Sequence, residues 1–427
     1  MTDSDTIFAL SSGPAPAAIA VIRISGPGAA EALRALAGRV PPPRRAVHAP
    51  LRDSAGALLD RALVLFLPGP HNATGEDTVE LHCHGGRAVI AAVEEALAAL
   101  PGLLPARPGE FTRRAFANGR IDLAEAEGLA DLLSAETELQ RRSALAMASG
   151  GFSRTVEAWR DRLLACSAAL EAVLDFADED DVALLPPDFA ARIAALREEL
   201  ADWLARPRAE ALREGFRVVI AGPPNAGKST LFNALVESEA AIATPIAGTT
   251  RDVLTRPVAI AGLPFLFVDT AGLRGETEDA IEAIGIARAR DALDRADLVL
   301  WLGAEGEGPA EAWEIAAQAD RADHVVKAAP RHGVSAVTGE GMDALRADLV
   351  AAARRAMPKP GEAALNERQH RLLGEAEAML AFAESLGDPL LVAEHLRLAR
   401  VAFDALVGRS TTEHMLDALF GRFCIGK

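Results

Sequence analysis

The stretch "GPPNAGKST", residues 222–230, decides the fold of the central part of this 427-residue chain. It fits the pattern G-x-x-x-x-G-K-[ST], with Gly222, Gly227, Lys228 and Ser229 at the fixed positions. The apolar run "FRVVIAG" leads into it and the helix-like run "STLFNALV" follows, which is the context that a phosphate-binding loop requires. The sequence therefore predicts a nucleotide site where backbone N–H groups and Lys228 hold phosphates and Ser229 ligates Mg²⁺.

Two further motifs follow in the order typical of P-loop GTPases. "DTAG", residues 269–272, comes after the strand-like run "PFLFV", so Asp269 falls at a strand's carboxyl end, where it can hold the water shell of the metal. "AGTTRD" lies between the two motifs, and its Thr250 can complete Mg²⁺ coordination. Leu273 stands where small GTPases carry a water-orienting Gln, so we expect transition-state charge to come from a partner, a dimer mate or a cation.

The base-reading element is the least regular part of the predicted site. GTPases of this type carry N-K-x-D before the last strand of the domain, and here we read V-K-A-A in "HVVKAAPRHGVSA", residues 324–336, with "HVV" as a strand. Lys327 is one of only four lysines among 44 basic residues, which favours it as the retained lysine of the motif. Ala329 then replaces the Asp that pairs with guanine N1–H and N2–H₂, so we expect weak GTP binding and relaxed base specificity.

The composition of the chain limits which partners it can bind and in which compartment we expect it. The net charge of −17 argues against wholesale electrostatic binding of nucleic acid, so any tRNA contact needs a local basic patch or a second protein. Three cysteines do not suggest a disulfide scaffold. The N-terminus has no basic segment before an apolar core, and no apolar run approaches 18 residues, so we expect a soluble, cytoplasmic protein without a membrane segment.

The texture of the chain changes three times, which predicts a multidomain fold of α/β and all-α parts. Short strand-like runs and turns fill residues 1–118, and alanine- and leucine-rich helical runs fill 119–212. An α/β segment covers 213–357, and helical texture returns over 358–427. We therefore expect one discontinuous helical domain, 119–212 with 358–427, split by an inserted Ras-like P-loop GTPase domain.

The motifs resemble the tRNA-modifying GTPase family MnmE, also called TrmE, over essentially the whole chain. "PNAGKSTLFNAL", "IAGTTRD" and "DTAGLR" carry the central resemblance, "VIRISG", "TGEDTVELHCHGG" and "PGEFTRRAFANGRIDLAEAEGLADL" the N-terminal one, and "FCIGK" the C-terminal one. The resemblance implies a tetrahydrofolate-binding, dimerising domain at 1–118. It further implies a homodimer that works with an FAD- and NADH-dependent partner on tRNA, installing an aminomethyl or carboxymethylaminomethyl group at C5 of the wobble uridine.

The resemblance also implies cofactors and the residues that hold them. The one-carbon donor would be 5-formyl- or methylene-tetrahydrofolate, bound by Arg23, Glu80, Arg120 and Lys427. K⁺ would lie between paired G domains, held by Asn225, Thr244, Ile246 and Thr249, and would do the work of an arginine finger. Glu282 would position the attacking water, although alone it reads as a solvated helix acid. The expected GTP-binding residues are Asn225, Ala226, Gly227, Lys228, Ser229, Thr230, Thr244, Pro245, Ile246, Ala247, Gly248, Thr249, Thr250, Asp269, Thr270, Ala271, Gly272, Lys327, Ser335, Ala336 and Val337.

Three features leave alternatives open. Cys424 matches the thiol position of the family's C-terminal motif and is either a buried structural cysteine or a group with a chemical role. "HCH", residues 82–84, puts two histidines on one strand face and Cys83 on the other, so a strand end is favoured over a metal site. The degenerate base motif leaves two functions, an active tRNA-modification GTPase or a folate-binding scaffold whose nucleotide domain has weak base specificity. The intact phosphate motifs favour the enzyme.

Overall fold

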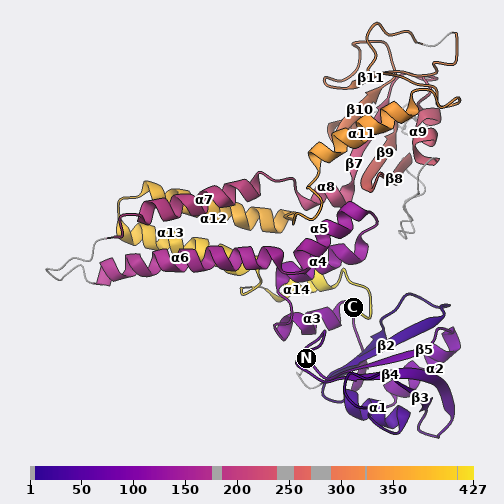
Figure 1. Cartoon of the computed structure of the whole chain (residues 1–427), viewed down its shortest axis with the longest axis vertical. Coiled ribbons are helices and arrows are strands. Elements are labelled where there is room, and N and C mark those ends of the chain that lie inside the picture. The colour runs from indigo at the N-terminus through magenta and orange to yellow at the C-terminus, as the bar shows by residue number, and fades with distance from the viewer. Residues whose placement is uncertain (1–4, 176–184, 238–253, 271–289, 323–324, 411) are drawn as a thin grey trace, which may run out of the picture. The chain divides into compact units, whose positions relative to one another are not determined.

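The computed structural model describes residues 5–175, 185–237, 254–270, 290–322, 325–410 and 412–427 (Figure 1). Contacts divide the chain into two compact units, Met1–Ala130 with Asp404–Lys427, and Asp131–Phe403. This division does not separate the three expected domains, whose boundaries stay predictions. Within the described ranges, no helix is both long and apolar enough to cross a membrane.

The first unit contains a six-stranded sheet in the order β3-β4-β5-β2-β1-β6, in which only β1 and β6 pair in parallel. Alternate residues of the central strands, such as Ile22 and Leu81, pack under two helices that cover the same face of the sheet (Figure 1). The opposite face therefore carries Arg23 and Glu80, which lie opposite each other in the strand register. The elements are β1 Thr6–Leu10, β2 Ile19–Ser25, α1 Ala29–Ala37, β3 Val47–Arg52, β4 Leu58–Leu67, β5 Thr78–His84, α2 Arg87–Ala98 and β6 Leu103–Pro105.

The C-terminal segment packs back onto this unit. Helix α3 (Glu110–Ala117) contacts α14 (Glu413–Phe420), and α4 (Leu123–Ser134) shares an apolar cluster with α14 through Leu123 and Phe420. Gly426 has φ +94°, and a Cβ there would lie 2.0 Å from the carbonyl oxygen of Leu10. Only glycine allows this close approach, so the last residues of the chain lie against β1.

The second unit joins a helical part to a second sheet. The helical part is held by an aromatic cluster in which Trp159 contacts Phe152, Trp203 and Phe403 at ring-centroid distances of 5.9–6.3 Å. Leu139 of α5 packs into the apolar core of the sheet part, so the two parts share buried surface. The helices are α5 Glu138–Ala148, α6 Gly151–Asp175, α7 Phe189–Leu204, α8 Ala209–Glu214, α12 Glu367–Ser385 and α13 Pro389–Leu406.

The second sheet has the order β12-β11-β10-β7-β9-β8, and all its pairs are parallel except β8 with β9. Because the carboxyl ends of parallel strands meet at one edge, the loops after β7, β10 and β11 converge there, next to the end of β9. Helices α9 and α11 pack into the main core of this sheet. The elements are β7 Phe216–Ala221, α9 Lys228–Glu237, β8 Leu254–Ile260, β9 Leu263–Asp269, β10 Leu298–Trp301, β11 Trp313–Ala316, β12 His332–Gly333 and α11 Met342–Ala356.

Most elements expected from apolar runs are present, with one error that bears on the site. The strands predicted from "FRVVIAG" and "PFLFV" are β7 and β9. The strand expected at "HVV" is not found where the structure describes it, because Val325 and Val326 are irregular and residue 324 lies outside the described ranges. The strand beside β10 is instead β11, Trp313–Ala316, which begins eleven residues before that stretch.

Candidate nucleotide site

The phosphate-binding loop has the backbone shape that the motif requires. It leaves β7 with Gly222 at φ 151° and passes Asn225 at φ 64° and Gly227 at φ 89° before α9 begins at Lys228. L-residues with side chains rarely adopt such values, and Asn tolerates them better than most. The chain therefore curls back on itself directly before a helix N-terminus, which is an anion-binding arrangement.

Hydrogen bonds order the charged and hydroxyl groups at the end of the loop. Lys228 is only 7% exposed, and its Nζ donates to the carbonyl oxygens of Gly222 at 3.0 Å and Pro223 at 2.7 Å. Ser229 Oγ donates to Asp269 Oδ2 at 2.6 Å, and Asp269 is fully buried. A hydroxyl and a carboxylate held together at the mouth of a phosphate loop are the oxygen ligands that Mg²⁺ prefers, so the donor set fits that ion.

The loop lines a cavity of about 1050 Å³. The expected residues Asn225, Gly227, Lys228, Ser229, Thr230 and Thr270 all face it. Thr270 Oγ1 donates to the carbonyl oxygen of Ile220 at 2.9 Å, which ties the end of β9 to β7. Residues that sequence reasoning did not name, including Trp301, Gln318 and Arg321, line the same cavity.

The segment after β11 lines this cavity, whereas no residue of the V-K-A-A stretch does. Here the chain reads Ala317, Gln318, Ala319, Asp320, which has the spacing of N-K-x-D and follows the correct strand. Gln318 Nε2 donates to the carbonyl oxygen of Asn225 at 3.2 Å, so this segment touches the phosphate loop directly. Asp320 Oδ1 accepts from Ser335 Oγ at 2.6 Å. An adjoining pocket brings Gly227, Gln318 and Asp320 together with Ala336 and Val337.

Lys327, expected beside the base, has a different place and a different partner. It lines neither of these pockets. Its side chain is 0% exposed, and its Nζ donates to the carbonyl oxygen of Trp301 at 2.7 Å and pairs with the Glu314 carboxylate. Burial raises the pKa of Glu314, but the hydrogen bond and charge of Lys327 outweigh it, so the pKa lies below the ordinary value. The Lys327 side chain is therefore engaged by Glu314 and Trp301, away from the two pockets, and we no longer expect it to lie against the base.

Ala328 and Ala329 also line neither pocket. The backbone N–H groups of Ala328 and Ala329 donate to the Glu305 carboxylate, which closes that turn on itself. The signal that could have drawn attention to the segment after β11 is "WEIAAQAD", residues 313–320, a short apolar run that ends in an acid.

Part of the expected site lies outside the described residues. This holds for the expected Mg²⁺ ligand Thr250, for three expected K⁺ ligands and for Glu282. The residues concerned are Thr244, Pro245, Ile246, Ala247, Gly248, Thr249, Thr250, Ala271, Gly272 and Glu282.

In the first unit, two of the four expected folate residues are in contact. Arg23 Nε and Nη2 donate to Glu80 Oε1 at 3.2 and 2.9 Å, and the guanidinium lies 5.8 Å from the centroid of the Phe111 ring. Burial raises the pKa of Glu80, but Arg23 and His82 outweigh it, so the carboxylate stays ionised below its ordinary range. Arg120 Nε donates to the carbonyl oxygen of Asn72 at 3.2 Å. Lys427 follows Gly426, which lies against Leu10 on β1, the strand next to Arg23.

The cysteines and histidines give two further outcomes. Cys424 is exposed, so the reading of it as a buried structural cysteine is wrong. Burial raises the pKa of Cys83 to about 12, which keeps that thiol protonated. His82 pairs with Glu80 and His84 with Asp60, while Cys83 faces the core, as the strand reading predicted. Among the described residues, no group of three or more His, Cys, Asp and Glu could hold a metal ion.

The parallel sheet, the curled loop before α9 and the paired Ser229 and Asp269 define a P-loop GTPase domain. A family model described as the N-terminus of the GTP-binding protein TrmE matches residues 6–120, and one described as the MnmE helical domain matches residues 123–424. The tRNA modification GTPase MnmE of Erythrobacter litoralis is 65% identical over 99% of this chain and 100% of its own length. That of Novosphingobium aromaticivorans is 66% identical over the same shares.

The chain therefore belongs to the MnmE family of tRNA modification GTPases. A solved structure, the G domain of the T. maritima FeoB iron transporter, is 26% identical over 32% of this chain and 98% of its own, with a TM-score of 0.23.

Proposed function

We propose that this tRNA modification GTPase binds and hydrolyses GTP in the cavity between the phosphate loop and the segment after β11. The observation that carries the proposal is that two adjoining pockets bring together the phosphate-binding loop, with Lys228 and Ser229, and the carboxylate of Asp320. Gly227, Thr230 and Gln318 belong to both pockets. One nucleotide can therefore lie with its phosphates at Lys228 and its base at Asp320.

Each group has a role that its chemistry allows. Lys228 places a positive charge at the β- and γ-phosphates, and Ser229 and Asp269 hold Mg²⁺ and its water shell. Mg²⁺, when bound, neutralises charge that develops on the phosphate oxygens. Asp320 can accept hydrogen bonds from guanine N1–H and N2–H₂, and the Ala336 N–H can donate to O6. The scaffold alternative rested on a missing Asp, so Asp320 removes its main support.

Transition-state charge and water positioning are assigned by the family resemblance. K⁺ would be held by Asn225 together with Thr244, Ile246 and Thr249, and Glu282 would orient the attacking water. A cation between phosphates lowers the barrier in the way an arginine finger does. The turn at Asn225 is the described part of that site, and Gln318 supports its carbonyl oxygen.

The wider reaction follows from the same family. We propose that hydrolysis drives modification of C5 of the wobble uridine in certain tRNAs, in the cytoplasm, by a homodimer working with an FAD-dependent partner. The one-carbon unit comes from a tetrahydrofolate derivative at Arg23, Glu80, Arg120 and Lys427. The ordered pair of Arg23 and Glu80 supports this, because a carboxylate can accept from an aminopyrimidine edge while cations meet a glutamate tail.

Steady-state hydrolysis of GTP, ITP, XTP and ATP, in K⁺ and again in Na⁺, tests the proposal. We expect turnover to be stimulated by K⁺ and to favour GTP over the other nucleotides. Lys228→Ala in the same assay shows whether the turnover belongs to this chain. Absence of hydrolysis under every condition would contradict the proposal and leave a folate-binding partner protein.

A further inference from the structure

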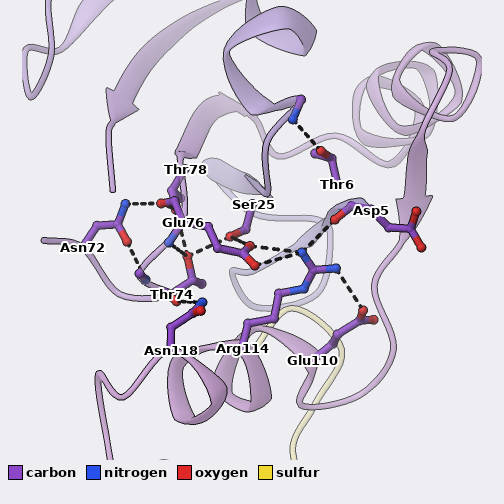
Figure 2. Close-up of polar contacts among 12 residues, drawn as sticks. Asp5, Thr6, Ser25, Asn72, Thr74, Glu76, Thr78, Glu110, Arg114 and Asn118 are labelled. Atoms are coloured by element: carbon purple, nitrogen blue, oxygen red, sulfur yellow. Dashed lines mark hydrogen bonds and ion pairs between the residues drawn. The ribbon is translucent and has the colours of Figure 1, made fainter. Parts of the chain in front are cut away.

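A polar network around Arg114 joins α3 to the sheet of the first unit (Figure 2). Arg114 Nη1 donates to Glu76 Oε2 at 3.0 Å and to the carbonyl oxygen of Asp5 at 2.8 Å. Its Nη2 donates to Glu110 Oε1 at 3.4 Å. Ser25 Oγ at the end of β2 donates to Glu76 Oε2 at 2.8 Å. Nothing in the proposed chemistry uses these four side chains.

The network fixes the loop of residues 72–76. Ser25 and Thr74, 0% and 1% exposed, share a hydrogen bond of 2.7 Å, and Thr74 Oγ1 also lies 3.1 Å from Thr78 Oγ1. Asn118 Nδ2, at the end of α3, donates to the carbonyl oxygen of Thr74 at 2.8 Å. Buried polar groups are costly when unpaired, so this loop has one favoured position relative to α3 (Figure 2).

That loop in turn holds Arg120. The carbonyl oxygen of Asn72 accepts from Arg120 Nε at 3.2 Å, and Asn72 Oδ1 accepts from the Gly75 N–H at 2.8 Å. Gly75 has φ +81°, and a Cβ there would lie 3.2 Å from Cγ of Arg120. The Arg120 side chain therefore runs against the backbone of the loop that Glu76 and Thr74 hold in place.

We propose that Arg114 and Glu76 are positioning residues that hold the Arg120 guanidinium ready for a carboxylate, the glutamate tail of a folate. The inference rests on the proposed folate binding and assigns part of its affinity to side chains that do not touch the ligand. A free arginine loses rotamer freedom when it binds, whereas one held by a fixed loop has lost it already. Removing the support weakens only the contact that Arg120 makes.

The test compares a folate with the same molecule lacking its tail. Titration of the full chain with 5-formyltetrahydrofolate and with the corresponding pteroamide, in which a neutral carboxamide replaces the glutamate tail, gives the tail advantage as a ratio of two dissociation constants. We expect a ratio of about 10 or more for the wild type, as one charge-assisted contact gives. Arg120→Met removes the advantage directly. Glu76→Gln and Arg114→Met lower it about as far, and leave binding of the tail-less analogue unchanged.

Matched controls separate positioning from stability. Glu31→Gln and Arg34→Met remove the same charges from an exposed pair on α1 and leave the ratio unchanged. Thermal unfolding of each variant reports any loss of fold. Ser25→Ala is a milder change, because it removes one hydrogen bond to the Glu76 carboxylate. We expect it to lower the tail advantage about threefold. This variant tests the inference if Glu76→Gln does not fold.

The outcomes are distinct. A Glu76→Gln protein that loses affinity for both ligands equally, or for neither, overturns the inference while folate binding stands. An unchanged ratio in Ser25→Ala and Arg114→Met does the same. A wild-type chain that binds neither ligand overturns the proposed folate site itself, and the inference with it.

Discussion

The phosphate side and the base side of the nucleotide cavity lie at the same edge of one sheet but differ in how their sequences can vary. The phosphate side depends on side-chain chemistry and positive φ values, which fix Gly222, Gly227, Lys228 and Ser229. The base side keeps one carboxylate, Asp320, while Ala317 and Gln318 replace the Asn and Lys of the motif. A motif can therefore be recognised from sequence only at the positions where its chemistry or backbone geometry requires one residue type.

Substitutions of the two buried lysines, Lys228 and Lys327, should give the largest difference between the phosphate side and the base side. Lys228→Ala should lower GTP turnover by about 10²–10³-fold, because it removes a positive charge from the phosphates. Lys327→Met should leave kcat and KM for GTP within about twofold and should instead destabilise the domain by about 1–3 kcal/mol, since Glu314 loses its partner. Steady-state kinetics and thermal unfolding of both variants measure these effects.

A Lys327→Met protein that keeps its stability but binds GTP much more weakly would restore Lys327 to the base site. Glu314→Gln is the control for Lys327→Met, because each variant removes one partner of the same ion pair. They should have similar effects on unfolding and none on turnover.

The sequence allowed the fold class and the phosphate side to be predicted, because the strands β7, β9 and β10 are apolar runs next to contiguous motifs. It misled on the base side, where β11 has only four residues and an alanine-rich segment follows it. Asp320 is identified by contacts with residues far along the chain, such as Ser335. The network of Arg114 and Glu76 joins residues 38 positions apart, which no local pattern predicts.

The pH dependence of stability should report the Lys327 and Glu314 pair. The pKa of Glu314 is lowered in the folded protein, so the stability that the pair contributes is present above its ordinary value of 4.5 and is lost as the pH falls through the lowered value. The difference in unfolding temperature between the wild type and Glu314→Gln should be largest near neutral pH and should shrink as the pH falls below 4.5. A difference that is constant over this range would mean that the pair is not ionised as described.

Gln318→Lys should have the smallest effect. The Gln318 amide supports the carbonyl oxygen of Asn225, and a lysine there can reach the same oxygen while adding a positive charge near the phosphates. We expect the KM for GTP to fall about threefold with kcat little changed, and Gln318→Met to raise the KM by a similar factor. Equal kinetics for both variants would show that the contact has no part in binding.

The most direct test of the account is the base preference of Asp320→Asn. The Asp accepts from N1–H and N2–H₂ of guanine, whereas an Asn amide can donate to the oxygen that xanthine carries at position 2. The account predicts that the wild type prefers GTP over XTP by about 10²-fold or more and that Asp320→Asn reverses the preference. A variant that still prefers GTP, with kinetics like those of the wild type, would contradict the assignment of Asp320 as the group that reads guanine.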